Sequence, residues 1–87
     1  MERHFVIKNQ LGLHARAAAK MVQLSNTYDS NLMIRFDGQE VDGKSILDIL
    51  TLACPVGSEI LLRADGPDAD KVLEAMERLI ESKFGEE

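Results

Sequence analysis

Apolar residues recur at every second position in several short stretches of the chain, and this spacing predicts four strands. The expected strands cover residues 5–8, 32–36, 39–41 and 60–64, because every second side chain in each can face a core. Asp37-Gly38 separates the second stretch from the third and is a strong hairpin signal. These two strands are therefore expected to be antiparallel neighbours.

Three other stretches carry apolar residues at helical spacing. A helix is expected over residues 15–25, a short one over residues 45–52 capped by the Ser45 hydroxyl, and a last one from about Asp68 to Phe84, with Gly85 able to cap its end. The order βαββαβα predicts an α+β fold. We expect a four-stranded antiparallel open-faced β-sandwich with three helices on one face, formed by residues 1–87 as a single domain.

Composition and charge narrow the class of protein. The chain has 87 residues, 45% of them hydrophobic, and a single cysteine, which excludes an internal disulfide framework. It contains no membrane-spanning stretch or signal peptide, so a cytoplasmic location is expected. A net charge of −5 argues against a nucleic-acid partner. Acidic residues are frequent late in the chain, while Lys8, Arg16 and Lys20 cluster near the first helix, where a positive local field is expected.

The clearest candidate for chemistry lies where the first strand gives way to the first helix. The first turn of a helix leaves N–H groups without intrahelical partners and carries partial positive charge, so it stabilises an anion. His14 precedes this turn, and the backbone of Ala15, Arg16 and Ala17 forms it. The local charge favours a neutral, nucleophilic imidazole. His14 is therefore predicted to accept a phosphoryl group, with Arg16 as the phosphate clamp.

The segment Gly12-Leu13-His14-Ala15-Arg16-Ala17-Ala18 resembles the active-site motif of HPr-type phosphocarrier proteins of the bacterial phosphotransferase system. The resemblance continues at Asp42-Gly43-Lys44-Ser45-Ile46-Leu47, which is similar to the regulatory serine segment of that family, and in the closing helix. Residues 9–19 also resemble the nitrogen-related (NPr) branch. One departure is Ala17, where the family usually has proline. Alanine is also a good helix former and supplies one more N–H donor.

This resemblance implies a protein that carries phosphate and is not itself an enzyme. His14, through Nδ1, would receive the phosphoryl group from an enzyme I-type donor charged by phosphoenolpyruvate and pass it to enzyme IIA-type acceptors. Ser45 would be a regulatory phosphorylation site for an HPr kinase/phosphorylase. The apolar residues of the second helix cannot all face the core, so some of them are expected to be exposed. With the resemblance, this implies a partner-binding surface composed of Ala15, Ala19, Ile46, Leu47 and Leu50. We expect a monomer.

Other interpretations remain open at this point. The chain could be a non-catalytic regulatory binding module controlled by Ser45, with His14 idle, or an unrelated α/β domain with a deep ligand pocket. Ser45 could serve only as a helix cap, and Leu47 or Leu50 could fold back onto the core. No cofactor is expected, since glycine-rich phosphate loops are lacking. His4, His14 and Cys54 are not spaced as metal ligands, so no metal is expected either.

Overall fold

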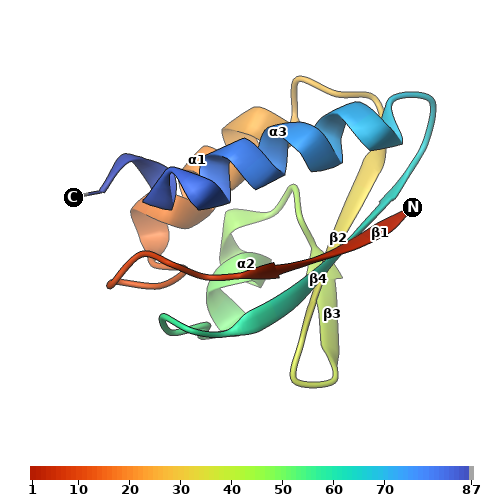
Figure 1. The fold of residues 1–87 in the computed structure, drawn as a ribbon. Coiled ribbons are helices and arrows are strands. Elements are labelled where there is room, and N and C mark those ends of the chain that lie inside the picture. Colours follow the sequence, from red (N-terminus) through yellow and green to blue (C-terminus); the bar gives the residue numbers. More distant parts are fainter. Residues whose placement is uncertain (87) are drawn as a thin grey trace.

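Residues 1–86 are described by a computed structural model in which four antiparallel strands form one sheet (Figure 1). The strand order is β1-β4-β2-β3, with bounds β1 (Glu2–Val6), β2 (Asn31–Phe36), β3 (Gln39–Asp42) and β4 (Glu59–Asp65). The predicted hairpin is confirmed, with Phe36 paired to Gln39 across the turn. The first strand ends at Val6, earlier than predicted. Val6 pairs with Glu59, the first residue of β4, so β4 provides no strand partner beyond that point.

Helices α1 (Ala15–Ser25) and α3 (Ala69–Glu81) lie side by side over one face of the sheet (Figure 1). The short helix α2 (Ile46–Thr51) packs against α1 and β3. Its N-cap is Ser45, whose Oγ accepts a hydrogen bond from the Asp48 N–H at 3.3 Å. The predicted α+β open-faced sandwich and the predicted cap are both confirmed.

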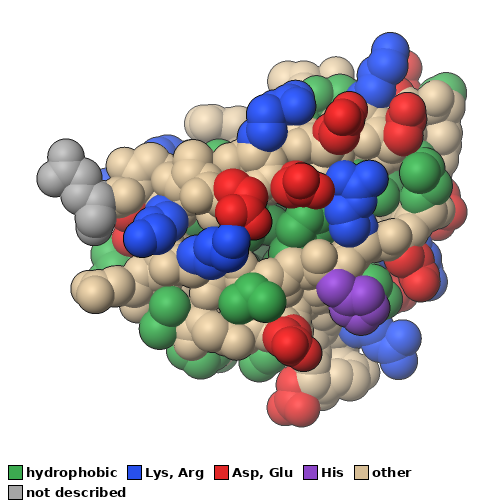
Figure 2. Space-filling view, viewed as in Figure 1, with side chains coloured by type: hydrophobic (Ala, Val, Ile, Leu, Met, Phe, Trp, Pro, Cys, Tyr) green, Lys and Arg blue, Asp and Glu red, His purple; other side chains and the backbone are tan. Residues whose placement is uncertain are grey.

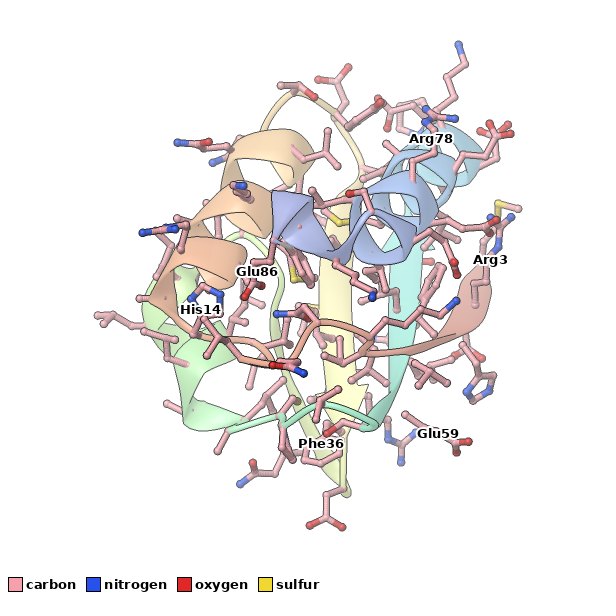
Figure 3. The ribbon with its side chains drawn as sticks, turned by 60° about the vertical axis from the view of Figure 1, so that its left-hand side comes forward. Arg3, His14, Phe36, Glu59, Arg78 and Glu86 are labelled. Carbon is pink, nitrogen blue, oxygen red and sulfur yellow. The ribbon has the colours of Figure 1, made fainter. Side chains whose placement is uncertain are left out.

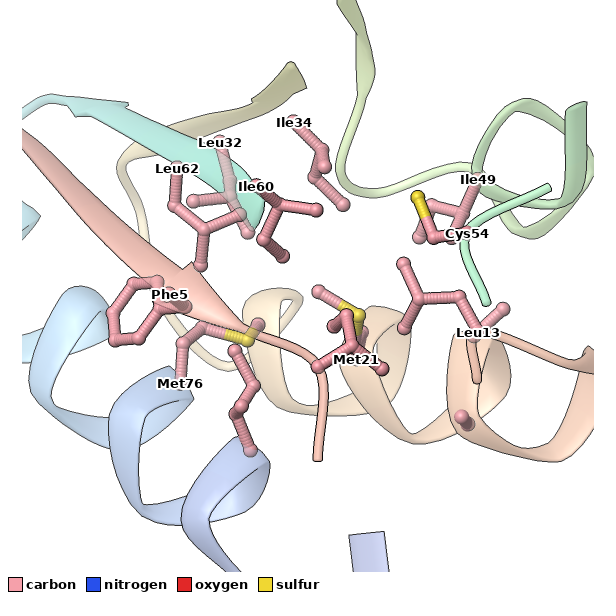
Figure 4. Packing of buried hydrophobic residues seen from close by; sticks show 14 of the residues in the cluster. Phe5, Leu13, Met21, Leu32, Ile34, Ile49, Cys54, Ile60, Leu62 and Met76 are labelled. Atoms are coloured by element: carbon pink, nitrogen blue, oxygen red, sulfur yellow. The ribbon is translucent and has the colours of Figure 1, made fainter. Parts of the chain in front are cut away.

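The core lies between the sheet and the helices (Figure 4). Ile60, Leu62 and Ala64 of β4 are at most 1% exposed, as their alternation predicts. Met21 of α1 and Met76 of α3 meet them from the helical layer and are fully buried. Each large side chain buried in this way stabilises the fold by about 1.5–3 kcal/mol relative to an exposed one, so the helical layer is firmly attached to the sheet.

The last helix is shorter than predicted. It ends at Glu81, and a separate 3-10 turn, η1 (Lys83–Gly85), follows it. Lys83 and Phe84 have φ angles of 57° and 56°, in the left-handed region that costs a non-glycine residue about 1–2 kcal/mol. Burial of the Phe84 side chain, which is 1% exposed, offsets that cost. Gly85, with a φ of 77°, therefore ends the 3-10 turn and does not cap α3.

Asp68, predicted as the first residue of the last helix, is its N-cap and ties the helix to the turn after α1. Its carboxylate accepts hydrogen bonds from the Ser30 hydroxyl and from the N–H groups of Asp29 and Ser30, the last two at 2.9 Å. The Ser30 hydroxyl, followed by the Asp29 N–H, lowers the pKa of the Asp68 carboxyl below 3.8. The charged carboxylate thus holds together two segments that are far apart in the sequence.

This carboxylate predicts a defined pH dependence of stability. Because the pKa of Asp68 is lower in the folded state than its ordinary 3.8, its contribution is present above that value and is lost as pH falls through the lower folded-state pKa. Asp68→Asn is expected to unfold at lower urea concentration than the wild type at neutral pH. The difference should shrink towards about pH 2. A difference that stays constant between the two conditions would contradict this role.

Candidate functional site

The loop before α1 is held by a close approach between two backbone segments. The Leu13 N–H donates to the Cys54 carbonyl oxygen at 2.9 Å, and Leu13 is buried. Gly12 has a φ of 68°, and a Cβ on it would lie 2.3 Å from the same carbonyl oxygen. Only glycine fits both the backbone conformation and the space. This contact determines where the chain enters α1.

Cys54 contributes a backbone acceptor and a packing side chain to this contact. Its side chain is buried in the core. Burial raises the pKa of the Cys54 thiol to about 11, because an apolar environment disfavours the thiolate. The thiol is therefore neutral near neutral pH and is a poor nucleophile or metal ligand.

His14 is the N-cap residue of α1, and its imidazole makes the capping hydrogen bond. The Arg16 N–H donates to His14 Nδ1 at 3.2 Å, while the His14 carbonyl oxygen accepts the first intrahelical bond from the Ala18 N–H at 2.9 Å. A ring nitrogen thus takes the place of the hydroxyl or carboxylate oxygen that usually caps a helix. The lone pair of Nδ1 points at the positive end of the helix.

The other ring nitrogen contacts a residue that the sequence did not reveal (Figure 3). His14 Nε2 lies 3.2 Å from Glu86 Oε2. A carboxylate only accepts, and the Arg16 N–H only donates, so a single neutral tautomer satisfies both contacts, with the proton on Nε2. The side chain of His14 is 25% exposed and that of Glu86 is 15% exposed. The two residues are 72 positions apart, and no local pattern could have joined them.

The predicted phosphate-binding groups form the first turn of α1. The N–H groups of Ala15, Arg16 and Ala17 precede the Ala18 N–H that begins the helical ladder. The side chain of Arg16 is exposed, while Ala17, at the position of the family's proline, is fully buried. An anion in front of Nδ1 would therefore meet N–H donors and have the guanidinium within the same turn.

The expected positive field around His14 is reduced, because acidic residues from the end of the chain return to this region. Lys8 Nζ pairs with Glu81 at 2.6 Å, and Glu86 contacts His14 itself. Lys20 Nζ donates to the Phe84 carbonyl oxygen. Figure 2 shows acidic and basic side chains interleaved over α3 and β1. Lys8 and Arg16 are both exposed, and within residues 1–86 Arg16 is the member of the predicted cluster whose side chain forms no ion pair or hydrogen bond.

A groove of about 490 Å³ lies between β1 and α3, and His14 is not among the residues that line it. Ion pairs from Arg3 to Glu77 and from Lys8 to Glu81 run along it. Residues 1–86 hold no group of three or more His, Cys, Asp or Glu side chains arranged for a metal ion. Within the same residues, no helix has the length and apolar character needed to cross a bilayer.

The predicted apolar surface is divided between solvent and core. Leu47 is 77% exposed and Ile46 is 38% exposed, whereas Leu50 is half-buried and packs against the core. The alternative that one leucine folds back onto the core is therefore confirmed for Leu50 alone. On α1, Ala15 is exposed and Ala19 is half-buried. We call these five residues the apolar surface.

Comparison with known proteins identifies the family. A family model described as "PTS HPr component phosphorylation site" matches residues 1–82. The chain belongs to the HPr phosphocarrier family of the phosphotransferase system. The phosphocarrier protein HPr of Cupriavidus necator is 42% identical over 86 residues, which cover 99% of this chain and 97% of that protein. The phosphocarrier protein NPr of Shewanella violacea is 38% identical over 86 residues, covering 99% and 94%.

Solved structures of the family share the fold. The crystal structure of HPr-C-His from Thermoanaerobacter tengcongensis matches with a TM-score of 0.96 at 41% identity and covers 100% of this chain and 98% of that one. The resemblance drawn from residues 12–18 and 42–47 is thereby confirmed at the level of family and fold.

The close approach at Gly12 predicts a large loss of stability on substitution. Gly12→Ala is expected to lose about 1–3 kcal/mol more free energy of unfolding than Gly57→Ala, because it adds a clash to the cost of a positive φ. Gly57 is the matched control, since its φ is 89° and nothing lies within 4 Å of an added Cβ. Urea unfolding measures both. Equal losses in the two variants would show that the close approach contributes nothing.

Proposed function

We propose that His14 carries a phosphoryl group on Nδ1 between two protein partners. The observation that supports this most strongly is the 3.2 Å hydrogen bond from the Arg16 N–H to Nδ1. It keeps the lone pair of Nδ1 at the start of α1, where backbone donors and the helix dipole stabilise an anion. The N–H groups of Ala15, Arg16 and Ala17 bind the phosphoryl oxygens, and the Arg16 guanidinium neutralises their charge.

The transfer is an exchange of one nitrogen–phosphorus bond for another. The Arg16 N–H releases Nδ1 and turns to a phosphoryl oxygen, and the freed lone pair of Nδ1 attacks the phosphorus of a phosphohistidine on an enzyme I-type donor. The bond in the donor breaks, and its electron pair returns to the donor nitrogen. The proton on Nε2 stays in place. In the second exchange a nucleophile of an enzyme IIA-type acceptor attacks the phosphorus, and the bond from His14 Nδ1 breaks with its electron pair returning to Nδ1. The chain accordingly works as a carrier and not as an enzyme.

The apolar surface is proposed to contact both partners. It lies on α1 and α2, which pack against each other next to His14, and it includes the most exposed leucine of α2. Excluding water around the transferring group strengthens the electrostatic contacts in the site. We further propose that residues 1–87 act as one cytoplasmic domain and as a monomer, so that the same surface is free for each partner in turn.

Phosphorylation of Ser45 by an HPr kinase/phosphorylase is proposed as a second layer of control. Ser45 is half-buried at the start of α2, two residues before Leu47. A phosphate there would be favoured by the helix start. It would also place about two negative charges beside the apolar surface, which disfavours association with a partner. The regulatory-module alternative uses the same serine but leaves His14 without a function.

Substitution of the two site residues tests the carrier function. His14→Ala is expected to abolish labelling from phosphoenolpyruvate and enzyme I, because no nucleophile remains. Arg16→Ala should fold normally but accept the phosphoryl group about 10- to 100-fold more slowly, since a charge-assisted hydrogen bond is worth about 1.5–3 kcal/mol. His4→Ala and Arg78→Ala, at exposed positions, are the controls. Full labelling of His14→Ala would reject the carrier function.

The docking role of the apolar surface is tested by binding measurements. Leu47→Ser should weaken the complex with enzyme I about tenfold, because burying a leucine contributes about 1.5–3 kcal/mol and part of that is lost. Protein phosphorylated at Ser45 should show a loss in the same direction. Val6→Ser, at a position 43% exposed on β1, is the control. If Val6→Ser weakens the complex as much as Leu47→Ser, the contact surface lies elsewhere.

A further inference from the structure

The end of the chain lies beside the start of α1. Lys83, Phe84 and Gly85 all have positive φ angles, so the backbone makes a left-handed turn after α3. Two contacts hold this turn in place. Phe84 is 1% exposed in the core, and Lys20 of α1 donates its ammonium group to the Phe84 carbonyl oxygen. The position of Glu86 is therefore determined by packing that reaches into the core.

Glu86 is also held by the loop that carries His14. Asn9 is fully buried, and its Nδ2 donates both to the Gly12 carbonyl oxygen at 2.7 Å and to Glu86 Oε2 at 2.5 Å. The same Oε2 atom lies 3.2 Å from His14 Nε2. One carboxylate oxygen thus accepts from the loop before the site and from the imidazole. A buried amide committed to two acceptors gives the carboxylate a defined position.

The geometry points to Glu86 as a positioning residue for His14. Its carboxylate holds the proton on Nε2 and the plane of the ring, so that the lone pair of Nδ1 faces the first turn of α1. When Nδ1 forms its bond to phosphorus, the ring retains the Nε2 proton and gains positive charge, which the adjacent carboxylate stabilises. No atom of Glu86 enters the N–P bond. This role rests on the proposed function of His14 as the phosphoryl acceptor.

A carboxylate beside a phosphorylated residue could also obstruct the site by repelling the anion. Glu86 does not obstruct the site here, because it contacts the ring nitrogen that does not receive the phosphoryl group. Glu86 contacts Nε2, whereas the Arg16 N–H contacts Nδ1, and the two nitrogens lie on different edges of the imidazole. Negative charge on one side and helix dipole on the other polarise the ring in the direction that phosphoryl acceptance requires.

The nitrogen-15 spectrum of the unphosphorylated protein tests this role directly. In the wild type, Nε2 should show the shift of a protonated ring nitrogen and Nδ1 that of an unprotonated one. Glu86→Ala should shift both resonances towards averaged values, while Glu86→Gln, which keeps an acceptor oxygen, should preserve the wild-type pattern. Glu74→Gln, at an exposed position of α3, removes the same charge as a control. A wild-type spectrum in Glu86→Ala would overturn the positioning role.

Transfer kinetics give the second readout. Removing a carboxylate that orients a metal-binding histidine typically costs about 10- to 100-fold in activity. Glu86 contacts a ring nitrogen of His14 in the same way, so Glu86→Ala should accept the phosphoryl group about tenfold more slowly or worse. Glu86→Gln should recover part of that loss, and Glu74→Gln should match the wild type. A rate in Glu86→Ala equal to that of Glu74→Gln would overturn the inference. Absence of labelling in the wild type would instead reject the function of His14 and leave the spectrum to decide on Glu86.

Discussion

The hydrogen bond from the Arg16 N–H to His14 Nδ1 is the interaction on which the site depends. It makes His14, the residue we propose as the nucleophile, the cap of α1, so the same geometry that begins the helix also directs the lone pair of Nδ1 towards the positive end of the helix. One hydrogen bond therefore both caps α1 and orients Nδ1. A serine or aspartate at this position would also cap the helix. Neither side chain has an imidazole nitrogen that could exchange a phosphoryl group.

Two opposing supports keep this imidazole in place. Before it, the loop rests on the Cys54 carbonyl oxygen through the Leu13 N–H, at a distance that only a glycine at position 12 allows. After it, the end of the chain returns and places Glu86 on Nε2. Asn9 connects the two supports through one buried amide. The core fixes the ends of both, since Leu13 and Phe84 are buried.

The sequence predicted the sheet, the helices and the placement of His14 at a helix start, because each depends on local periodicity or capping chemistry. It placed α1 at residues 15–25, as the structure has it. It failed at the end of α3, because Phe84 continues the apolar stripe equally well in a helix or in a buried turn. The positive φ angles of Lys83 and Phe84 come from tertiary burial, which local patterns do not report.

The same limit explains why Glu86 was missed. The sequence pattern separates the acidic residues late in the chain from the basic residues near His14, yet the turn after α3 places one of these acidic residues against His14, 72 positions away. Nitrogen–phosphorus coupling in the labelled, phosphorylated protein decides whether Nδ1 is the atom that carries phosphate. We expect coupling of phosphorus to His14 Nδ1. Coupling to Nε2, or to any other residue, would contradict it.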